Sequence, residues 1–190
     1  ADGHQTLSAE EIDAVLDGWN SPARGTGEAW VAAGQAHDID AAIALAQFER
    51  ESGAGSNPAW DASTKNPGNI RASSNSFRNY ATWEEGIEAH LSLLASYRDE
   101  YWITNVRDAI YRWAPPADAN DTEGYIAHVE GQLDGWRAAK AGQFVTDGNV
   151  GRREKLLVAR IRQGVVLARP QIEDMHRVLR WVCNVEFFVI

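Results

Sequence analysis

The sequence has only one cysteine, Cys183, so no disulfide can form within the chain and a Cys-x-x-Cys metal site is excluded. It also has no apolar run of the roughly 18 to 20 residues that a membrane-spanning helix needs. Cations are few, with 18 Lys and Arg against 27 Asp and Glu and a formal net charge of −9. Because nucleic-acid binding requires clustered cations, this charge disfavours a general nucleic-acid binder.

Several local motifs of catalysis and cofactor binding are absent as well. There is no G-x-x-x-x-G-K-[ST] or G-x-G-x-x-G loop, no H-E-x-x-H motif and no G-x-S-x-G nucleophile elbow. The histidines are widely spread without a metal-ligand partner at helical spacing, and most are expected to be exposed or half-buried. We therefore expect no metal and no cofactor. The histidines are His4, His37, His90, His128 and His176.

What is present fits a soluble globular protein of one domain with an appendage. Hydrophobic residues make up 44% of the 190 residues and charged residues 24%. We assign residues 1–137 to the domain, 138–150 to a glycine-containing linker, and 151–190 to a basic helical extension of unknown role. The start of the sequence lacks the basic and apolar regions of a signal peptide, so either the protein is cytosolic or a targeting segment has been removed.

Helical periodicity dominates residues 5–137. Capping boxes at Ser8 and Thr82 each precede an amphipathic stretch, and further helices are expected before Pro115 and after Asp121. The stretch 41–48 is apolar nearly all round and is expected to be a buried central helix, capped by Asp38 or Asp40. Residues 53–80 are rich in Gly, Asn, Ser and Pro. The pattern predicts a mainly α fold around that central helix, with a small loop-rich or β-hairpin lobe.

Glu51 is the strongest candidate for chemistry because of its position. It follows the buried helix and precedes a glycine turn. An apolar setting and the negative end of the helix dipole both raise the pKa of a carboxyl group. A carboxyl group that stays protonated is what a glycosidase uses to protonate the leaving oxygen. The alternative is a polar helix end that is ion-paired with Arg50 or Lys65.

Two segments carry a family resemblance: Ala44-Leu-Ala-Gln-Phe-Glu-Arg-Glu-Ser-Gly-Ala-Gly55 and Asn66-Pro-Gly-Asn-Ile-Arg71. They resemble the bacterial glucosaminidase-type members of the lysozyme superfamily, the mannosyl-glycoprotein endo-beta-N-acetylglucosaminidase-like domains. Three further segments follow the family pattern in order, around Ser21, over 77–86 and over 113–126, so the resemblance covers roughly residues 5–137. It implies a lysozyme-like α+β fold.

The resemblance also implies roles for individual residues. Glu51 becomes the general acid, with Glu49 pointing elsewhere on its helix. The residues implied to line the sugar cleft are Asn69, Ile70, Arg71, Tyr80, Trp113 and Tyr125, with the backbone of Asn69 and Ile70 suited to an N-acetyl group. Tyr80 and Tyr125 are equally well read as core aromatics at helix starts. Of four tryptophans that could stack on sugars, Trp60, Trp83, Trp102 and Trp113, we expect one or two to do so.

Two departures from the family pattern bear on mechanism. Trp113 stands where the family usually has Tyr before Ala-Pro, which keeps an aromatic wall and loses a hydroxyl. Asp61 is the only acidic residue between Ser52 and Thr82, so it is the sole candidate from the lobe for a second catalytic carboxylate. Its alternative role is to stabilise the turn after Trp60. Without it, the 2-acetamido group of the substrate or an anhydro product would complete the reaction.

The resemblance therefore predicts a peptidoglycan hydrolase that cleaves β-1,4 bonds of the N-acetylglucosamine/N-acetylmuramic acid glycan. Its partner would be the glycan strand, and it would be secreted or associated with the cell wall, with its signal peptide outside these residues. The alternatives are a lytic transglycosylase that uses the same acid, a cell-wall-binding domain without turnover, and a purely structural helical protein.

Overall fold

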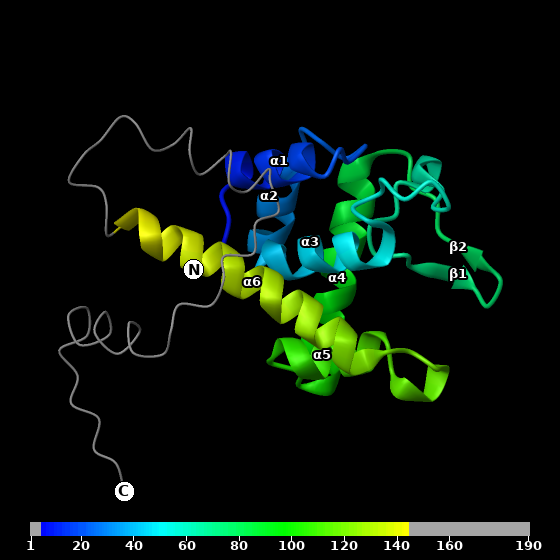
Figure 1. The fold of residues 1–190 in the computed structure, drawn as a ribbon. Helices are drawn as coiled ribbons and strands as arrows, with labels where there is room; N and C mark the ends of the chain where they lie inside the picture. Colours follow the sequence, from blue (N-terminus) through cyan, green and yellow to red (C-terminus); the bar gives the residue numbers. More distant parts are fainter. Residues whose placement is uncertain (1–4, 145–190) are drawn as a thin grey trace, which may run out of the picture.

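The computed structural model of the protein describes residues 5–144, which form a mainly helical fold with one small hairpin (Figure 1). This confirms the predicted fold class. The helices are α1 (Ala9–Gly18), α2 (Gly27–His37), α3 (Ala41–Ser52), α4 (Trp83–Tyr101), α5 (Val106–Trp113) and α6 (Thr122–Phe144), with 3-10 turns η1 (Ala62–Thr64) and η2 (Pro116–Asp118). The antiparallel strands are β1 (Arg71–Ser73) and β2 (Ser76–Phe77).

Side-chain caps explain where four of the helices begin. The Ser8 hydroxyl accepts a hydrogen bond from the Glu11 amide, and the Glu11 carboxylate accepts one from the Ser8 amide, which completes the predicted capping box. Thr82 caps α4 by accepting from the Glu85 amide, but the Glu85 carboxylate accepts from the Ala81 amide, so the predicted capping box forms only in half. Asp40, rather than Asp38, caps α3, and Asn105 caps α5.

Helix α3 is the buried centre of the fold, as its composition predicts. Eight of its residues are buried, and the long helix α6 runs across it (Figure 1). Helices α2 and α4 also pack against it. The apolar face of α6 covers α3 with a row of residues at helical spacing, namely Tyr125, Ile126, Val129, Leu133 and Trp136. This packing brings the start of α6 next to the end of α3.

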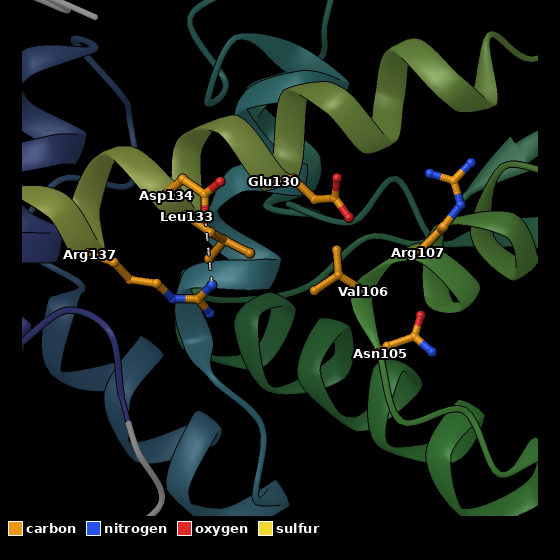
Figure 2. Close-up of a pocket in the computed structure, with 7 residues that line it drawn as sticks. All are labelled: Asn105, Val106, Arg107, Glu130, Leu133, Asp134 and Arg137. Carbon is orange, nitrogen blue, oxygen red and sulfur yellow. Dashed lines mark ion pairs between the residues drawn. The ribbon is translucent and has the colours of Figure 1, made fainter. Parts of the chain in front are cut away.

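Helix α5 packs against α6, and a pocket of about 380 Å³ lies where α5 begins (Figure 2). Leu133 and Val106 form its apolar part. Charged groups of both signs surround them on α5 and α6. The lining residues are Asn105, Val106, Arg107, Glu130, Leu133, Asp134 and Arg137.

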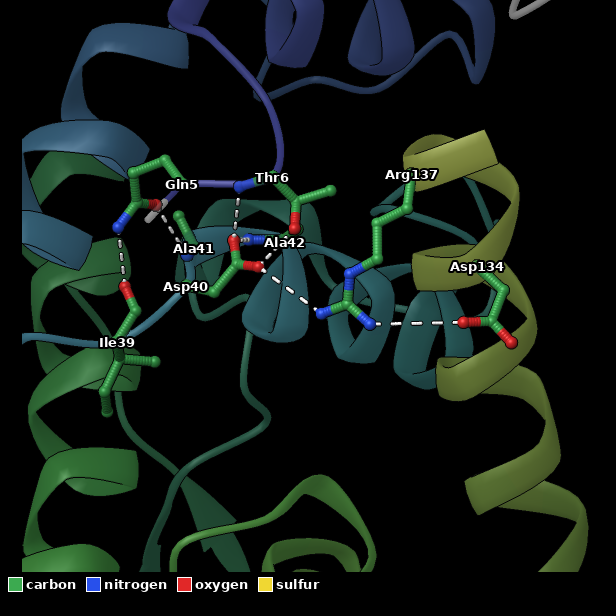
Figure 3. Close-up of polar contacts among 8 residues, drawn as sticks. All are labelled: Gln5, Thr6, Ile39, Asp40, Ala41, Ala42, Asp134 and Arg137. Carbon is green, nitrogen blue, oxygen red and sulfur yellow. Dashed lines mark hydrogen bonds and ion pairs between the residues drawn. The ribbon is translucent and has the colours of Figure 1, made fainter. Parts of the chain in front are cut away.

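The start of the described chain fastens the start of α3 (Figure 3). Gln5 donates to the Ile39 carbonyl and accepts from the Ala41 amide, both at 2.8 Å. Asp40 accepts from the Thr6 amide at 3.0 Å, from the Thr6 hydroxyl, and from the Ala42 amide at 3.1 Å. Arg137 of α6 reaches the same carboxylate at 3.8 Å. These contacts fix α3 relative to α6 at the end opposite Glu51.

The loop-rich lobe spans 53–80 and ends in the exposed hairpin, which projects beyond the C-terminal end of α3 (Figure 1). The lobe rests on the first turn of α4 through a close backbone contact. A methyl group at Gly86 would lie 1.9 Å from the Lys65 carbonyl oxygen, so only glycine allows this approach. The buried Asn66 side chain then donates to the carbonyls of Ile70 and Arg78 at 2.9 and 3.1 Å.

The described chain ends inside α6, which continues through Phe144. Residues 138–144, which the sequence pattern assigned to a linker, are therefore helical. The predicted basic extension, 151–190, lies outside the described residues. Within the described part, no helix combines the length and the hydropathy needed to cross a membrane.

Candidate active site

Glu51 lies in the last turn of α3, and the chain turns away directly after it. Gly53 adopts a left-handed conformation with φ of 60°, which ends the helix. The Ser52 hydroxyl donates to the Phe48 carbonyl at 3.0 Å and accepts from the Gly55 amide at 2.8 Å. This buried serine locks the turn, so the Glu51 carboxylate is held at the edge of the lobe.

Three side chains from three other segments donate hydrogen bonds to the Glu51 carboxylate. The Trp113 indole nitrogen of α5 donates to Oε1 at 2.9 Å, and the Tyr125 hydroxyl of α6 donates to the same oxygen at 2.7 Å. The Asn69 amide of the lobe donates to Oε2 at 2.9 Å. Glu51 itself is half-buried. Three of the predicted site residues therefore converge on the predicted acid.

The surroundings of Glu51 differ from the wholly apolar setting that its position suggested. Its closest neighbours are aromatic residues and an amide that each direct a polar hydrogen at it. The alternative of an ion-paired helix end is not found either. Lys65 donates to the Ala81 carbonyl, and the Arg50 guanidinium lies over the Tyr125 ring, 5.7 Å from its centroid.

Tyr125 is buried and acts as a fixed donor. Burial first, and then the negative charge of Glu51, raise the pKa of its hydroxyl. The hydroxyl therefore keeps its proton across the physiological range. Trp113 supplies the second donor at the position where the resemblance implies a tyrosine, and an indole N–H can only donate. Tryptophan at position 113 thus still donates a hydrogen bond to Glu51 Oε1.

Asn69 joins Glu51 to the lobe. Its backbone is left-handed, with φ of 48°. Its side-chain oxygen accepts from the Trp60 indole nitrogen at 2.6 Å, while its nitrogen donates to Glu51. Because the indole can only donate, this contact fixes which end of the amide faces the carboxylate. Trp60 thereby orients Asn69, a role that the sequence pattern did not reveal.

The backbone of Asn69 and Ile70 is occupied by contacts within the lobe. The Asn69 amide donates to the Asn66 carbonyl at 3.0 Å, and the Ile70 amide donates to the Asn66 side chain at 2.9 Å. The Ile70 carbonyl accepts from the Arg78 amide and from Asn66. Internal partners therefore satisfy both backbone amides, and a role of the backbone of Asn69 and Ile70 in holding an N-acetyl group stays a prediction.

Arg71 and Tyr80 lie farther along the lobe. Arg71 is exposed on the hairpin, where its guanidinium donates to the Ser74 carbonyl and stacks on Phe77 at 4.9 Å. The Tyr80 ring is half-buried, and its hydroxyl has no hydrogen-bond partner among the described residues. Burial raises the pKa of this hydroxyl, against an opposing effect of Arg78. Neither residue forms one of the hydrogen bonds to Glu51.

Asp61 caps the short turn η1. Its side chain accepts from the Ser63 amide at 3.0 Å and from the Ser63 hydroxyl at 2.6 Å, and the residue is exposed. These two hydrogen bonds, the hydroxyl first, lower the pKa of the carboxyl group. The contacts match the turn-stabilising alternative considered for this residue.

The four tryptophans considered for sugar stacking have different surroundings. Trp60 and Trp83 stack on each other with ring centroids 6.2 Å apart, and Phe48 packs against both. Trp113 contacts the carboxylate. Trp102 is 86% exposed in a left-handed conformation at the end of α4, with an open face.

Two buried polar residues near Glu51, Gln47 and His90, were not identified from the sequence as part of its surroundings. Gln47 stands one helical turn before Glu51, and a polar residue inside an apolar helix was the available signal. His90 of α4 is fully buried, an exception to the expectation that most of the histidines are exposed or half-buried. Burial lowers the pKa of its imidazole to about 3, so it is neutral. The sequence signal for its burial was helical periodicity, because His90 shares one face of α4 with Ile87, Leu91 and Leu94.

The ionisable residues near Glu51 do not form a metal site in the described part of the chain. Glu49 contacts His128 of α6, on another side of α3 from Glu51, as expected for a neighbour that points elsewhere. Among residues 5–144, no group of three or more His, Cys, Asp or Glu side chains is arranged to hold a metal ion. The pocket of Figure 2 contains none of the predicted site residues.

The arrangement can hold one carboxyl group in a single orientation at a half-buried position. Oε1 accepts two hydrogen bonds and Oε2 accepts one, so Oε2 keeps a free lone pair. A group so placed can donate or accept one proton at Oε2. This is the geometry of a general acid or base whose side chain does not reorganise during proton transfer.

Comparison with models of protein families matches residues 27–138 to the family described as mannosyl-glycoprotein endo-beta-N-acetylglucosaminidase. The match covers more than half of the chain, from the first residue of α2 into α6. It includes Glu51 and all three of its hydrogen-bond donors. The comparisons with curated proteins and with solved structures returned no match.

Proposed function

The chain belongs to the glucosaminidase family, and on this basis we propose that it is a glycoside hydrolase that cleaves β-1,4 bonds in the peptidoglycan glycan, with Glu51 as the general acid. The family match supports a hydrolase acting on a glycan. The observation that carries the assignment of the acid is the convergence of Asn69, Trp113 and Tyr125 on one half-buried carboxylate.

In this proposal the proton that reaches the glycosidic oxygen comes from Oε2. The two donors at Oε1 already occupy that oxygen, and a proton placed there would displace one of them. The proton at Oε2 passes to the bridging oxygen as the bond to the anomeric carbon breaks. Trp113, Tyr125 and Asn69 then stabilise the carboxylate that remains.

The electron-deficient anomeric carbon needs a second group, and Asp61 is a weak candidate because its Oδ1 accepts both hydrogen bonds from Ser63 and so caps η1. We propose that a water molecule completes the reaction, either by attacking the anomeric carbon directly or by opening the ring that the 2-acetamido oxygen of the substrate first forms with that carbon. An intramolecular attack by a sugar hydroxyl would instead give an anhydro product, as in a lytic transglycosylase. Glu51 would be the acid in each route.

Replacing Asp61 with Asn tests the second group directly. Asparagine keeps the oxygen that accepts from Ser63, so η1 stays capped while the charge is lost. We expect a change of less than about 0.5 kcal/mol in the free energy of unfolding, and a rate close to that of wild type because the variant keeps the contacts of η1. Initial rates on purified cell walls measure it. A loss on the order of 10²-fold would instead make Asp61 the second catalytic carboxylate.

Product analysis tests the proposed function itself. The purified protein is incubated with peptidoglycan, and the soluble fragments are separated and analysed by mass spectrometry. We expect new reducing ends, and borohydride reduction before analysis identifies which sugar carries them. Anhydro-muramyl ends would change the proposal to transglycosylation. Intact glycan strands under conditions where the protein is folded and bound to walls would refute catalysis and favour a binding domain.

The location follows from the proposed substrate. Peptidoglycan lies outside the cytoplasmic membrane, so the protein must reach the cell wall to act on it. We therefore propose that it works as a secreted or wall-associated protein.

A further inference from the structure

A buried polar pair joins α3 and α4 directly beneath the candidate acid. The His90 ring and the Gln47 side chain are both fully buried, and His90 Nε2 lies 3.1 Å from Gln47 Oε1. Because a carbonyl oxygen only accepts, Nε2 must carry the proton. The ring is neutral, and its pKa of about 3 excludes a second proton near neutral pH.

Burying this pair lowers the free energy of unfolding. Within the described residues, His90 Nδ1 and Gln47 Nε2 are buried without a hydrogen-bond partner. Leaving a buried polar atom unsatisfied costs about 1 to 3 kcal/mol, whereas replacing both partners of such a pair with apolar groups is often neutral or stabilising. Packing alone therefore gives no reason for these residue types in the centre of an apolar helix pair.

The pair is linked to both donors to Glu51 Oε1, through a ring contact of His90 and an electrostatic effect of Gln47. The His90 ring packs against the Trp113 ring with centroids 5.0 Å apart and planes inclined by 39°. Gln47 opposes the rise in the pKa of the Tyr125 hydroxyl, and its side-chain nitrogen is buried without a hydrogen-bond partner among the described residues. The pair thus packs on one donor, Trp113, through His90, and influences the other, Tyr125, through the Gln47 amide.

Gly68 of the lobe packs closely against the His90 and Trp113 rings. A methyl group at Gly68 would lie 2.9 Å from two carbon atoms of the His90 ring and 3.0 Å from the Trp113 ring. The lobe backbone therefore presses directly on both rings, next to Asn69. Movement of His90 would be transmitted to Trp113 and to the segment that carries the third donor of Glu51.

We propose that Gln47 and His90 are positioning residues that hold the hydroxyl of Tyr125 and the indole of Trp113 in line with Glu51 Oε1. The proposal rests on the proposed role of Glu51 as the acid. Neither residue forms a hydrogen bond to the carboxylate, so they act through its donors. Their benefit is orientation, because a displacement of a catalytic group by about 1 Å can cost on the order of 10²-fold in rate.

The decisive variant is the double replacement of Gln47→Met with His90→Leu, which exchanges the pair for apolar groups of similar size. His90→Gln is the conservative partner variant, since its amide can still donate to Gln47. Thr26→Val is the matched control. Thr26 is also a buried polar residue in a hydrogen bond with an indole, that of Trp30 at 3.1 Å, but Trp30 is not part of the site.

We expect the double variant to unfold at the wild-type temperature or higher, while its kcat on solubilised glycan falls by roughly 10-fold to 100-fold with little change in KM. His90→Gln should recover part of that loss. Thr26→Val should unfold at a lower temperature and keep its rate per folded molecule. Equal kcat in the double variant and wild type would overturn the proposal, and so would a loss that only follows the fraction of folded protein.

A second measurement does not depend on activity. The eight tryptophans give eight indole N–H signals in a ¹⁵N-edited NMR spectrum, and Trp113→Phe identifies the signal of interest. We expect the double variant to shift the Trp113 signal in the direction that Glu51→Gln shifts it, while Thr26→Val leaves it in place. An unmoved signal would refute the positioning role. If wild type were inactive on glycan, the proposed function would fail, and this signal would still decide whether the pair positions the donor.

Discussion

Glu51→Gln is expected to lower the rate of wall cleavage by roughly 10³-fold, since general acid catalysis typically contributes 10²-fold to 10⁴-fold. The amide has almost the shape of the carboxylate and cannot deliver the proton. Its oxygen can still accept from Trp113 and Tyr125, while its nitrogen meets the Asn69 amide nitrogen, so one pair of donors is left facing each other. We expect a loss of about 1 kcal/mol in stability and an unchanged fold.

The control for this variant is Glu49→Gln. Glu49 lies two residues earlier on the same helix, carries the same charge, and contacts His128 on another side. It should keep near wild-type activity. Turbidity loss of cell walls gives the rate, and circular dichroism gives the folded state of each variant. Clearance by Glu51→Gln at the wild-type rate would show that this carboxyl group is not the acid.

Acidification is expected to destabilise the protein through His90. Burial holds the imidazole pKa at about 3 in the folded protein, whereas it is 6.5 for the unperturbed group. The unfolded chain therefore binds a proton first. Stability that is fully present above about pH 6.5 is lost as the pH falls toward the folded pKa. At pH 4.5 the loss attributable to His90 amounts to roughly 3 kcal/mol, because each pKa unit corresponds to about 1.4 kcal/mol.

His90→Gln isolates this contribution, because it removes the titrating group and keeps a donor for Gln47. Urea unfolding at pH 7 and pH 4.5 gives the free energy of unfolding of both proteins. We expect wild type to lose roughly 3 kcal/mol more than the variant between the two pH values. Other acidic groups titrate in both proteins and cancel in the comparison. Parallel losses would mean that His90 takes up a proton inside the folded protein.

Local sequence patterns predicted most of the fold because they act over short distances. The Ser8 capping box, the Thr82 cap and the apolar stretch of α3 involve residues within one or two helical turns of each other. Gly53 and the composition of 53–80 marked the end of α3 and the start of the lobe. Residues 138–144 continue α6 because a single glycine near a helix end does not always stop the helix, and the assignment of 138–150 to a linker stays a prediction.

The site was only partly accessible from the sequence. Position identified Glu51, and the family resemblance identified Asn69, Trp113 and Tyr125, which all contact it. The detail of these contacts was not predicted. The resemblance assigned the Asn69 backbone to the substrate, whereas the side chain binds the acid. Trp60 and Asn66 carried no local signal, because their roles depend on amide and carbonyl partners that the lobe brings together.

By itself, therefore, the sequence determined the helices, their caps, the buried central helix and the place of Glu51 at its end, because these depend on neighbours along the chain. Tertiary structure alone decided what surrounds that carboxylate. Its three donors lie 18, 62 and 74 residues away in the sequence, and no periodicity encodes such separations. The pairing of His90 with Gln47 and the contact of His90 with Trp113 were decided in the same way, since they result from the packing of α3 against α4 and of the lobe against both rings.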